Sequence, residues 1–373
     1  MNVVTGEFKD LASCFLLNVN YAGNLAVLAG HKVCGLVQLD TTIPYVIAKR
    51  SGKGANTHSR QVQDVKFQKG NNYNVFAEAS ANKLTLHDCT QELDPTKCIE
   101  FYAHKRNITS IDWNENTNLL ASCSLDNLLH IWDTRKKRQT PSIKINSSTS
   151  ASKITWEKTG DNILASTHES QLRIWDIRGK RDRPLGIYNN SENDLGPHCY
   201  GNNDFFNARS RRILSIDFSP RKRNMIVTGS ADSVVRIIEV NKICSSDVPD
   251  VIFQLPQKRW PVVNVKQTPF GEGIVTLAWN NACQGVGISS NSRFNLYQAR
   301  ENNVTLWTTR QNERMPTGSL VYTFYGHSDV ILDQDWLVDR SLQNESDYKL
   351  VTWSKDNTLK LWNINTISCF SLL

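Results

Sequence analysis

The stretch that decides the fold is Leu119-Leu-Ala-Ser-Cys-Ser-Leu-Asp-Asn-Leu-Leu-His-Ile-Trp-Asp133, because altered copies of it return further along the chain. The copies occupy residues 164–176, 227–238 and 350–362. In each copy, apolar and polar residues alternate on both sides of a short polar turn, which predicts two short strands joined by a hairpin. Recurrence at intervals of roughly forty residues predicts one supersecondary unit repeated along the chain.

The residues upstream of two copies agree at fixed offsets. The matching positions are His104, Asp112 and Trp113 in one copy and His327, Asp335 and Trp336 in the other, which opens with Gly326. Together with the Trp-Asp ending, this pattern resembles the WD repeat, whose unit is a four-stranded propeller blade. We therefore expect an all-β fold, a seven-bladed WD40-type β-propeller that spans residues 1–373 as a single domain.

The resemblance implies a structural role for four side chains in a complete repeat. An imidazole, a strand hydroxyl, a turn aspartate and an indole can satisfy one another, because the indole only donates and the carboxylate only accepts. Two predicted tetrads follow: His104, Ser122, Asp126 and Trp132, and His327, Thr352, Asp356 and Trp362.

Other copies depart from this pattern. The second copy has His87 where Trp is expected, and the fourth has Glu169 near the position of the turn aspartate. The fifth has Ile238 at the Trp position but keeps Thr228 and Asp232. The first and sixth are recognisable mainly as alternating strands between Gly or Asn turns.

The two chain ends compete for the last blade. An open sheet edge invites aggregation, so a propeller is expected to pair its ends. We expect residues 3–8 (Val-Val-Thr-Gly-Glu-Phe) to supply the outermost strand of the last blade, with residues 367–372 as the alternative.

The sequence argues against a membrane-spanning, secreted, zinc-binding or disulfide-rich protein. The chain lacks both an apolar run long enough to cross a bilayer and a secretory leader, so we expect a cytoplasmic protein. Its nine cysteines form no C-x-x-C pair, which indicates neither a zinc site nor a disulfide framework. We expect no metal and no cofactor.

Enzymatic signatures are missing. The sequence has no G-x-x-x-x-G-K-[ST], G-x-G-x-x-G, H-E-x-x-H or G-x-S-x-G motif. The recurring Ser-His-Asp combination is committed to tying loops to sheets rather than to catalysis. We therefore expect neither an enzyme nor a small-molecule substrate.

The net charge of +7 is unevenly distributed. Basic runs fall in loops of the third to fifth units, and the candidate partner-binding residues among them are Arg178, Lys180, Arg181, Arg183, Arg211, Arg212, Arg221, Lys222 and Arg223. Such runs either form one basic sector that contacts an acidic partner or a membrane, or they are solvated turns. Nucleic-acid binding is not expected, because aromatic residues that stack on bases are not interleaved with the charges.

Specific segments narrow the resemblance further. They are residues 3–8, 25–30 with 36–40, 59–61, 165–168 with 173–178, 267–271, and above all 334–336 through 347–362. These resemble the N-terminal propeller of the SEA complex (GATOR in animals) subunit that carries WD repeats and an RWD domain, the third SEA protein in fungi. The resemblance implies a non-catalytic scaffold of a coat-like complex, peripheral on the vacuolar or lysosomal membrane, whose partners are the other subunits. In that family the complex promotes target-of-rapamycin signalling by opposing a GTPase-activating subcomplex.

Two expectations qualify this resemblance. The RWD and RING-like domains of the family are absent from these 373 residues, so we expect the chain to be the N-terminal part of a longer protein. The alternative function is a substrate receptor of a cullin-RING ubiquitin ligase, because Arg135 and Arg178 each follow a Trp-Asp pair by two places, like the box with which such propellers dock on their adaptor.

Overall fold

The computed structural model is built almost entirely of antiparallel strands. Neighbouring strands in the chain pair with each other, as the hairpin pattern of the sequence predicts. The model describes residues 3–31, 33–51, 61–69, 74–91, 93, 97–136, 140–160, 162–179, 183–190, 211–232, 234–245, 251–254, 261–269, 273–278, 304–308, 319–338 and 348–364.

Within these described residues, the strands form seven four-stranded sheets. The first contains β2 (Cys14–Val19), β3 (Leu25–Gly30), β4 (Val33–Gln38) and β5 (Tyr45–Ser51). The second contains β6 (Val62–Phe67), β7 (Val75–Ser80), β8 (Lys83–Asp88) and β9 (Ile99–Tyr102). The third contains β10 (Ile108–Trp113), β11 (Leu119–Ser124), β12 (Leu128–Asp133) and β13 (Ile143–Asn146).

The remaining sheets repeat this order. The fourth contains β14 (Lys153–Trp156), β15 (Ile163–His168), β16 (Gln171–Asp176) and β17 (Gly186–Asn189). The fifth contains β18 (Ile213–Phe218), β19 (Met225–Ser230), β20 (Val235–Glu239) and β21 (Val251–Gln254). The sixth contains β22 (Val262–Gln267), β23 (Gly273–Ala278), β24 (Val304–Thr308) and β25 (Ser319–Phe324). Short helices are η1 (Lys9–Leu11), η3 (Cys89–Gln91) and α2 (Val240–Cys244).

The seventh sheet joins the two ends of the described chain. It consists of β26 (Ile331–Val338), β27 (Tyr348–Ser354), β28 (Thr358–Asn363) and the N-terminal strand β1 (Val3–Glu7). Strand β1 is outermost and pairs with β28, with Val3 opposite Trp362 and Glu7 opposite Thr358. The competing segment 367–372 lies outside the described residues.

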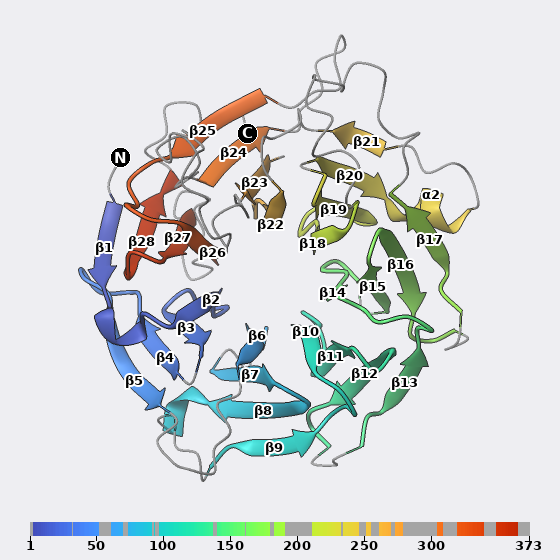
Figure 1. Ribbon diagram of the computed structural model, residues 1–373, viewed down its shortest axis with the longest axis horizontal. Helices are drawn as coiled ribbons and strands as arrows, with labels where there is room; N and C mark the ends of the chain where they lie inside the picture. The colour runs from blue at the N-terminus through green and yellow to red at the C-terminus, as the bar shows by residue number, and fades with distance from the viewer. Residues whose placement is uncertain are drawn as a thin grey trace, which may run out of the picture.

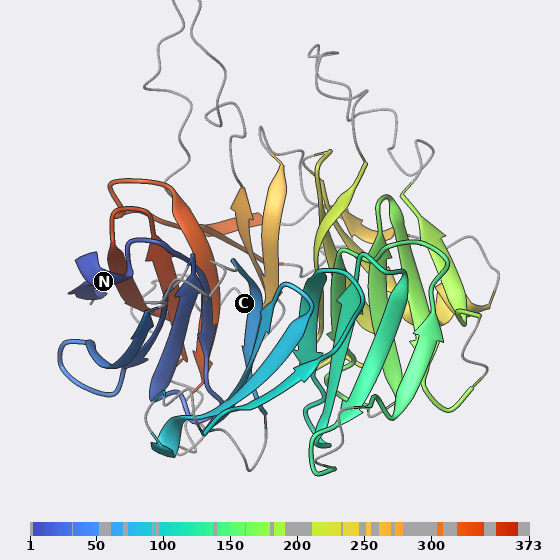
Figure 2. The ribbon, with the colours of Figure 1, turned by 60° about the horizontal axis from the view of Figure 1, so that its bottom comes forward.

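The sheets surround a common centre (Figure 1). Strands β2, β6, β10, β14, β18, β22 and β26 line that centre, and the fourth strand of each sheet lies at the perimeter. Seen from the side, the loops gather at two rims (Figure 2). We call the rim where the innermost strands begin the first rim, and the rim where they end the second rim.

The core consists of layers between neighbouring sheets. One layer packs Leu84 of the second sheet against Trp113 and Trp132 of the third, all nearly or fully buried. The next packs Ile131 of the third sheet against Trp175 of the fourth. Because each sheet is covered on both faces, its central strands are buried almost continuously, and large aromatic residues fill the layers.

The hairpin between the second and third strands turns through a left-handed residue in several sheets. Asn127 and Asn357 have φ angles of 67° and 63°, and each follows the aspartate of a predicted tetrad. Asparagine tolerates this conformation better than most residues, so the Asp-Asn pair is a local signal for the turn that holds the aspartate in place.

Candidate functional site

The predicted tetrad of the third sheet is a continuous chain of hydrogen bonds. Trp132 Nε1 donates to Ser122 Oγ at 3.0 Å, and Ser122 Oγ lies 2.8 Å from His104 Nε2. His104 Nδ1 lies 3.1 Å from Asp126 Oδ2. Because the indole only donates, the hydroxyl proton of Ser122 is directed to Nε2, and the N–H at Nδ1 donates to the carboxylate. Both Ser122 and His104 are buried, so a substrate cannot reach them.

The tetrad of the seventh sheet has the same geometry. Trp362 Nε1 donates to Thr352 Oγ1 at 2.8 Å, and Thr352 Oγ1 lies 2.7 Å from His327 Nε2. His327 Nδ1 lies 3.1 Å from Asp356 Oδ2. Asp356 also accepts a bond from the Ser328 backbone N–H at 2.8 Å, which ties the loop before β26 to the turn between β27 and β28.

The fourth sheet rebuilds part of this network with a histidine that the sequence analysis did not assign. Trp175 Nε1 donates to Ser166 Oγ at 2.8 Å, and His168 Nε2 lies 2.8 Å from the same oxygen. His168 comes from β15 itself and reaches the Thr149 carbonyl with Nδ1 at 3.2 Å. The Ser-x-His spacing on a strand is the signal that predicts it, since residues two apart share a face.

The second sheet replaces the tetrad with charged groups. Glu78 occupies the hydroxyl position on β7, and His87 occupies the Trp position on β8 with Nε2 3.1 Å from Glu78 Oε2. Arg50 of the first sheet forms an ion pair with the same carboxylate. In the fifth sheet, the fully buried Arg236 of β20 lies opposite Thr228 of β19. Its Nη2 donates to Asp232 Oδ2 at 2.9 Å.

These networks make stability dependent on pH. Burial lowers the pKa of His168 and of His327 from 6.5 to about 4. Asp126 is partly buried, which opposes ionisation, but the hydrogen bonds from His104 and from the Lys105 and Leu128 backbone N–H groups together outweigh burial and hold its pKa at about 2. The pKa values of these groups in the folded state all lie below those in the unfolded state. The free energy of unfolding is therefore highest at neutral pH and decreases as the pH falls.

We expect the melting temperature to fall between about pH 6.5 and pH 4, because the buried histidines bind protons in the unfolded state but not in the folded state. It should fall further below about pH 4, where the aspartates are protonated. Thermal melts across this range measure the effect. His168→Gln removes one titrating group and keeps a polar side chain, so its melting temperature should fall less steeply. A wild-type melting temperature that stays constant down to about pH 4 would contradict neutral buried histidines.

A second network was not predicted from the sequence. Carboxylates on the innermost strands cross to the innermost strand of a neighbouring sheet and accept hydrogen bonds from its backbone. Asp64 Oδ2 accepts from the Ile111 N–H at 3.0 Å, Asp112 Oδ2 from the Trp156 N–H at 2.8 Å, Asp217 Oδ2 from the Gln267 N–H at 2.9 Å, and Asp335 Oδ2 from the Val19 N–H at 3.0 Å. Asn18 does the same toward the Phe67 N–H at 2.7 Å. These bonds join consecutive sheets around the centre.

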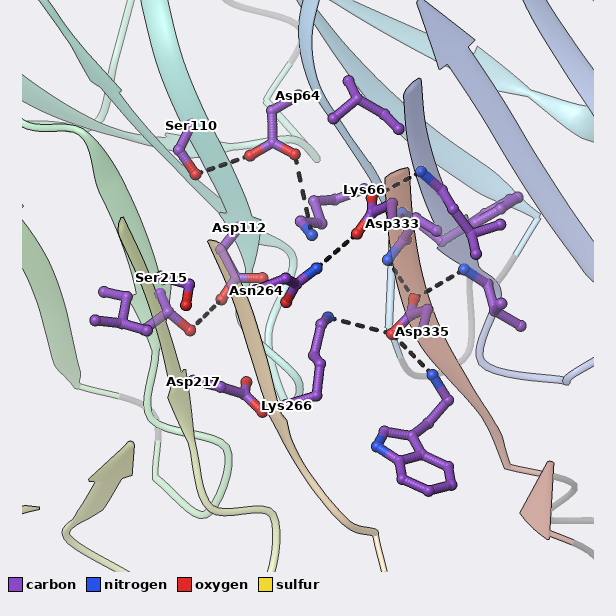
Figure 3. Close-up of a pocket in the computed structure, with 18 of the residues that line it drawn as sticks. Asp64, Lys66, Ser110, Asp112, Ser215, Asp217, Asn264, Lys266, Asp333 and Asp335 are labelled. Atoms are coloured by element: carbon purple, nitrogen blue, oxygen red, sulfur yellow. Dashed lines mark hydrogen bonds and ion pairs between the residues drawn. The ribbon is translucent and has the colours of Figure 1, made fainter. Parts of the chain in front are cut away.

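The same side chains line a central cavity of about 420 Å³ (Figure 3). Its carboxylates alternate with lysines: Lys266 Nζ lies 3.2 Å from Asp335 Oδ1, and Lys158 Nζ lies 2.7 Å from Asp217 Oδ1. Burial opposes ionisation of Asp335, but Lys266 and Lys66 hold its pKa below the usual value. Burial instead raises the pKa of Asp333. The cavity is therefore polar and close to balanced in charge.

We expect Asp112→Ala to cost about 2–3 kcal/mol of unfolding free energy, because it leaves the Trp156 N–H and the Thr155 hydroxyl, 3.0 Å from Asp112 Oδ2, without their buried acceptor. Denaturant unfolding measures this cost. Asp112→Asn keeps one side-chain oxygen and should lie between the wild type and the alanine variant. Equal stability of all three proteins would show that the crossing bond does not hold the two sheets together.

The predicted basic residues do not form one sector. Arg211 and Arg212 precede β18 at the first rim, whereas Arg221, Lys222 and Arg223 follow it at the second rim. Arg178 and Arg183 follow β16 and also lie at the second rim. Lys180 and Arg181 fall outside the described residues. Runs that are close in sequence were separated because a strand carries the chain from one rim to the other.

The two arginines that suggested adaptor docking have the same local structure. Arg135 Nε and Nη2 donate to the two carboxylate oxygens of Asp133, both at 2.9 Å. Arg178 donates from the same atoms to Asp176 at 3.0 and 2.8 Å. The Arg135 hydrogen bond lowers the pKa of Asp133 to about 2. Both arginine side chains remain about two-thirds exposed, at 68% and 67%.

The described part of the chain has neither a cluster of metal ligands nor a helix that could span a membrane. No group of three or more His, Cys, Asp or Glu side chains there is arranged to hold a metal ion. Cys14, Cys34, Cys89, Cys123 and Cys244 are free thiols, and Cys199, Cys283 and Cys369 lie outside the described residues. Of the helices described, none has the length and apolar character needed to span a bilayer.

Comparisons with known proteins agree with the repeat and its hydrogen-bonded tetrads. The family model "WD domain, G-beta repeat" matches residues 96–133, 203–239 and 318–363, which contain both complete tetrads. GATOR2 complex protein Wdr59 of Drosophila melanogaster is 30% identical over 265 residues, 70% of this chain and 22% of its own length. GATOR2 complex protein WDR59 of Homo sapiens is 27% identical over 374 residues, 98% of this chain and 32% of its own length. The chain is a WD40-repeat protein homologous to GATOR2 WDR59. It spans about a third or less of these two relatives.

A solved structure has a similar fold. A chain of the crystal structure of the mitotic checkpoint complex superposes with a TM-score of 0.66, covering 97% of this chain and 93% of that one at 15% identity. At this identity the likeness concerns the fold alone. The all-β WD40 β-propeller predicted from the sequence is confirmed, as is its resemblance to the SEA/GATOR subunit with WD repeats.

Proposed function

We propose that this chain is a non-catalytic scaffold that binds other subunits of a SEA/GATOR-type complex. The observation that carries the proposal is homology to GATOR2 WDR59 along 98% of the chain. The chemistry of the described polar groups agrees with it. The hydroxyl and imidazole groups of both tetrads are buried and hydrogen-bonded within the tetrad, and the carboxylates of the centre accept hydrogen bonds from backbone N–H groups of neighbouring sheets. These groups hold the sheets together, while exposed side chains lie on the two rims and on the outermost strands.

The frame we propose is a seven-bladed ring, in which each four-stranded sheet is one blade and β1 closes the last. Bonds between innermost strands support continuity around the ring, including those from Asp335 to Val19 and from Asp217 to Gln267. A closed ring leaves only the short outer edges of its sheets exposed. Such a frame suits a subunit that presents surfaces to several partners.

We propose the wider role from the resemblance of the sequence to the SEA/GATOR family. The complex would associate peripherally with the vacuolar or lysosomal membrane and would promote target-of-rapamycin signalling by opposing a GTPase-activating subcomplex. The propeller would contribute binding surfaces, and no step of chemistry is assigned to it.

Co-purification tests the scaffold directly. We expect tagged protein, expressed in cells and cross-linked before lysis, to recover the subunits of a SEA/GATOR-type complex, with cross-links on the rims. A variant carrying Trp132→Ala, which we expect to be unstable, is the control for recovery that does not depend on the folded propeller. Recovery of a cullin and its adaptor instead, with cross-links at Arg135 and Arg178, would support the alternative function of a ligase substrate receptor.

A further inference from the structure

The second rim carries exposed cations on three consecutive sheets. We define this second-rim basic surface by Arg135 and Lys136 of the third sheet, Arg178 and Arg183 of the fourth, and residues 221–223 of the fifth, all exposed. We propose that this surface docks an acidic polypeptide segment of a partner protein. The inference rests on the proposed scaffold function and specifies one contact of the scaffold, between its exposed cations and the carboxylates of a partner.

The first argument is the preorganisation of two guanidinium groups. Asp133 and Asp176 hold Arg135 and Arg178 through Nε and Nη2, and each arginine backbone N–H also donates to its aspartate, at 3.2 and 2.9 Å. A side chain fixed in this way loses less conformational freedom when a ligand binds. The planar guanidinium then offers its remaining N–H groups to a carboxylate in a defined direction. The two groups occupy the same position on neighbouring sheets, so they present a repeated feature.

The second argument is a link between the fourth and fifth sheets at this rim. Glu157, which is nearly fully buried, accepts a hydrogen bond from the Asn224 N–H at 3.0 Å, and Arg223 Nε lies 3.9 Å from the same oxygen. The side chain of Arg223 remains 71% exposed. Glu157 therefore holds the loop with residues 221–223 against the fourth sheet, where Arg178 and Arg183 lie. The loop with residues 221–223 is therefore tied to the neighbouring sheet instead of being independent of it.

The third argument distinguishes an acidic polypeptide from a lipid surface. Carboxylates are interspersed among the cations, because Asp133 and Asp176 lie directly beside the two arginines. The two acids are largely covered, with side chains 5% and 16% exposed, but they offset part of the positive charge, and a uniformly anionic plane responds mainly to that reduced net charge. A polypeptide places its carboxylates at separate points and can form charge-assisted hydrogen bonds with individual exposed guanidinium groups.

The test uses a pair of double variants that each remove two positive charges. Arg135→Gln with Arg178→Gln alters the second-rim basic surface, and Arg211→Gln with Arg212→Gln makes the same charge change at the first rim. The probe is a fluorescent peptide of about twenty residues rich in Glu. We expect the second-rim variant to bind it about tenfold more weakly at low salt, the first-rim variant to bind like the wild type, and raised salt to weaken wild-type binding. Thermal melts establish that both variants fold.

Three results would overturn the inference. If the wild type and the second-rim variant bound the peptide equally well, the second-rim basic surface would not be the binding site. If both variants lost the same affinity, binding would depend only on the net charge of the protein. Tighter binding to phosphatidylserine vesicles than to the peptide would point to a membrane. Co-purification separates this inference from the proposed function: recovery of complex subunits by wild type and second-rim variant alike leaves the scaffold intact, whereas no recovery by the wild type contradicts the scaffold while the peptide result stands.

Discussion

Trp132→Ala should lower the free energy of unfolding by about 3–5 kcal/mol, the cost typical of truncating a buried aromatic residue. Trp132 is 3% exposed and packs in the layer between the second and third sheets. Its removal opens a cavity there and leaves Ser122 Oγ without the indole donor at 3.0 Å. Equilibrium denaturation, followed by far-ultraviolet circular dichroism, measures the loss.

Two variants separate the causes. Trp132→Phe keeps most of the packing but removes the donor, so we expect it to cost less than about 2 kcal/mol. His87→Ala should also cost less than Trp132→Ala, because a smaller side chain is removed and Arg50 remains paired with Glu78. A melt of Trp132→Ala that matches the wild type would contradict the assignment of Trp132 to a structural tetrad.

Deleting residues 1–9 should lower stability by at least about 3 kcal/mol and promote aggregation. The deletion removes all of β1, which pairs with β28 from Val3 to Glu7, and it removes Phe8, which is 8% exposed. Phe8 packs in the layer between the seventh and first sheets with Leu359 and Leu361. Without β1, the long edge of β28 is free to pair with another chain.

Amide exchange in β27 and β28 locates the effect. We expect faster exchange at the β28 amides in the deletion variant, while deletion of residues 1–2 alone leaves the strand pairing intact and serves as the control. Exchange in β28 that is indifferent to the loss of residues 1–9 would show that the N-terminal strand does not close the sheet.

Local pattern accounts for the part of the fold that the sequence predicted. Apolar alternation around Asp126-Asn127 and Asp356-Asn357 specifies a hairpin, because the period and the turn chemistry act over a few residues. The tetrad residues could be found for the same reason: their spacing repeats between copies. Where a copy departs from the pattern, the spacing did not predict which residue completes the hydrogen-bond network. His168 is an example, because its partners Thr149 and Ser150 lie in a preceding loop.

By itself, the sequence determined the repeat, the strands, the turns and the membership of two side-chain tetrads, since each depends on residues whose spacing recurs. Only the tertiary structure decided what the innermost carboxylates do, because Asp112 acts on the backbone of β14 in another sheet. It also decided that Arg212 and Arg221 belong to opposite rims, since β18 carries the chain across between them. Contacts between sheets depend on how the repeats are arranged around the centre, and no spacing within one repeat encodes that arrangement.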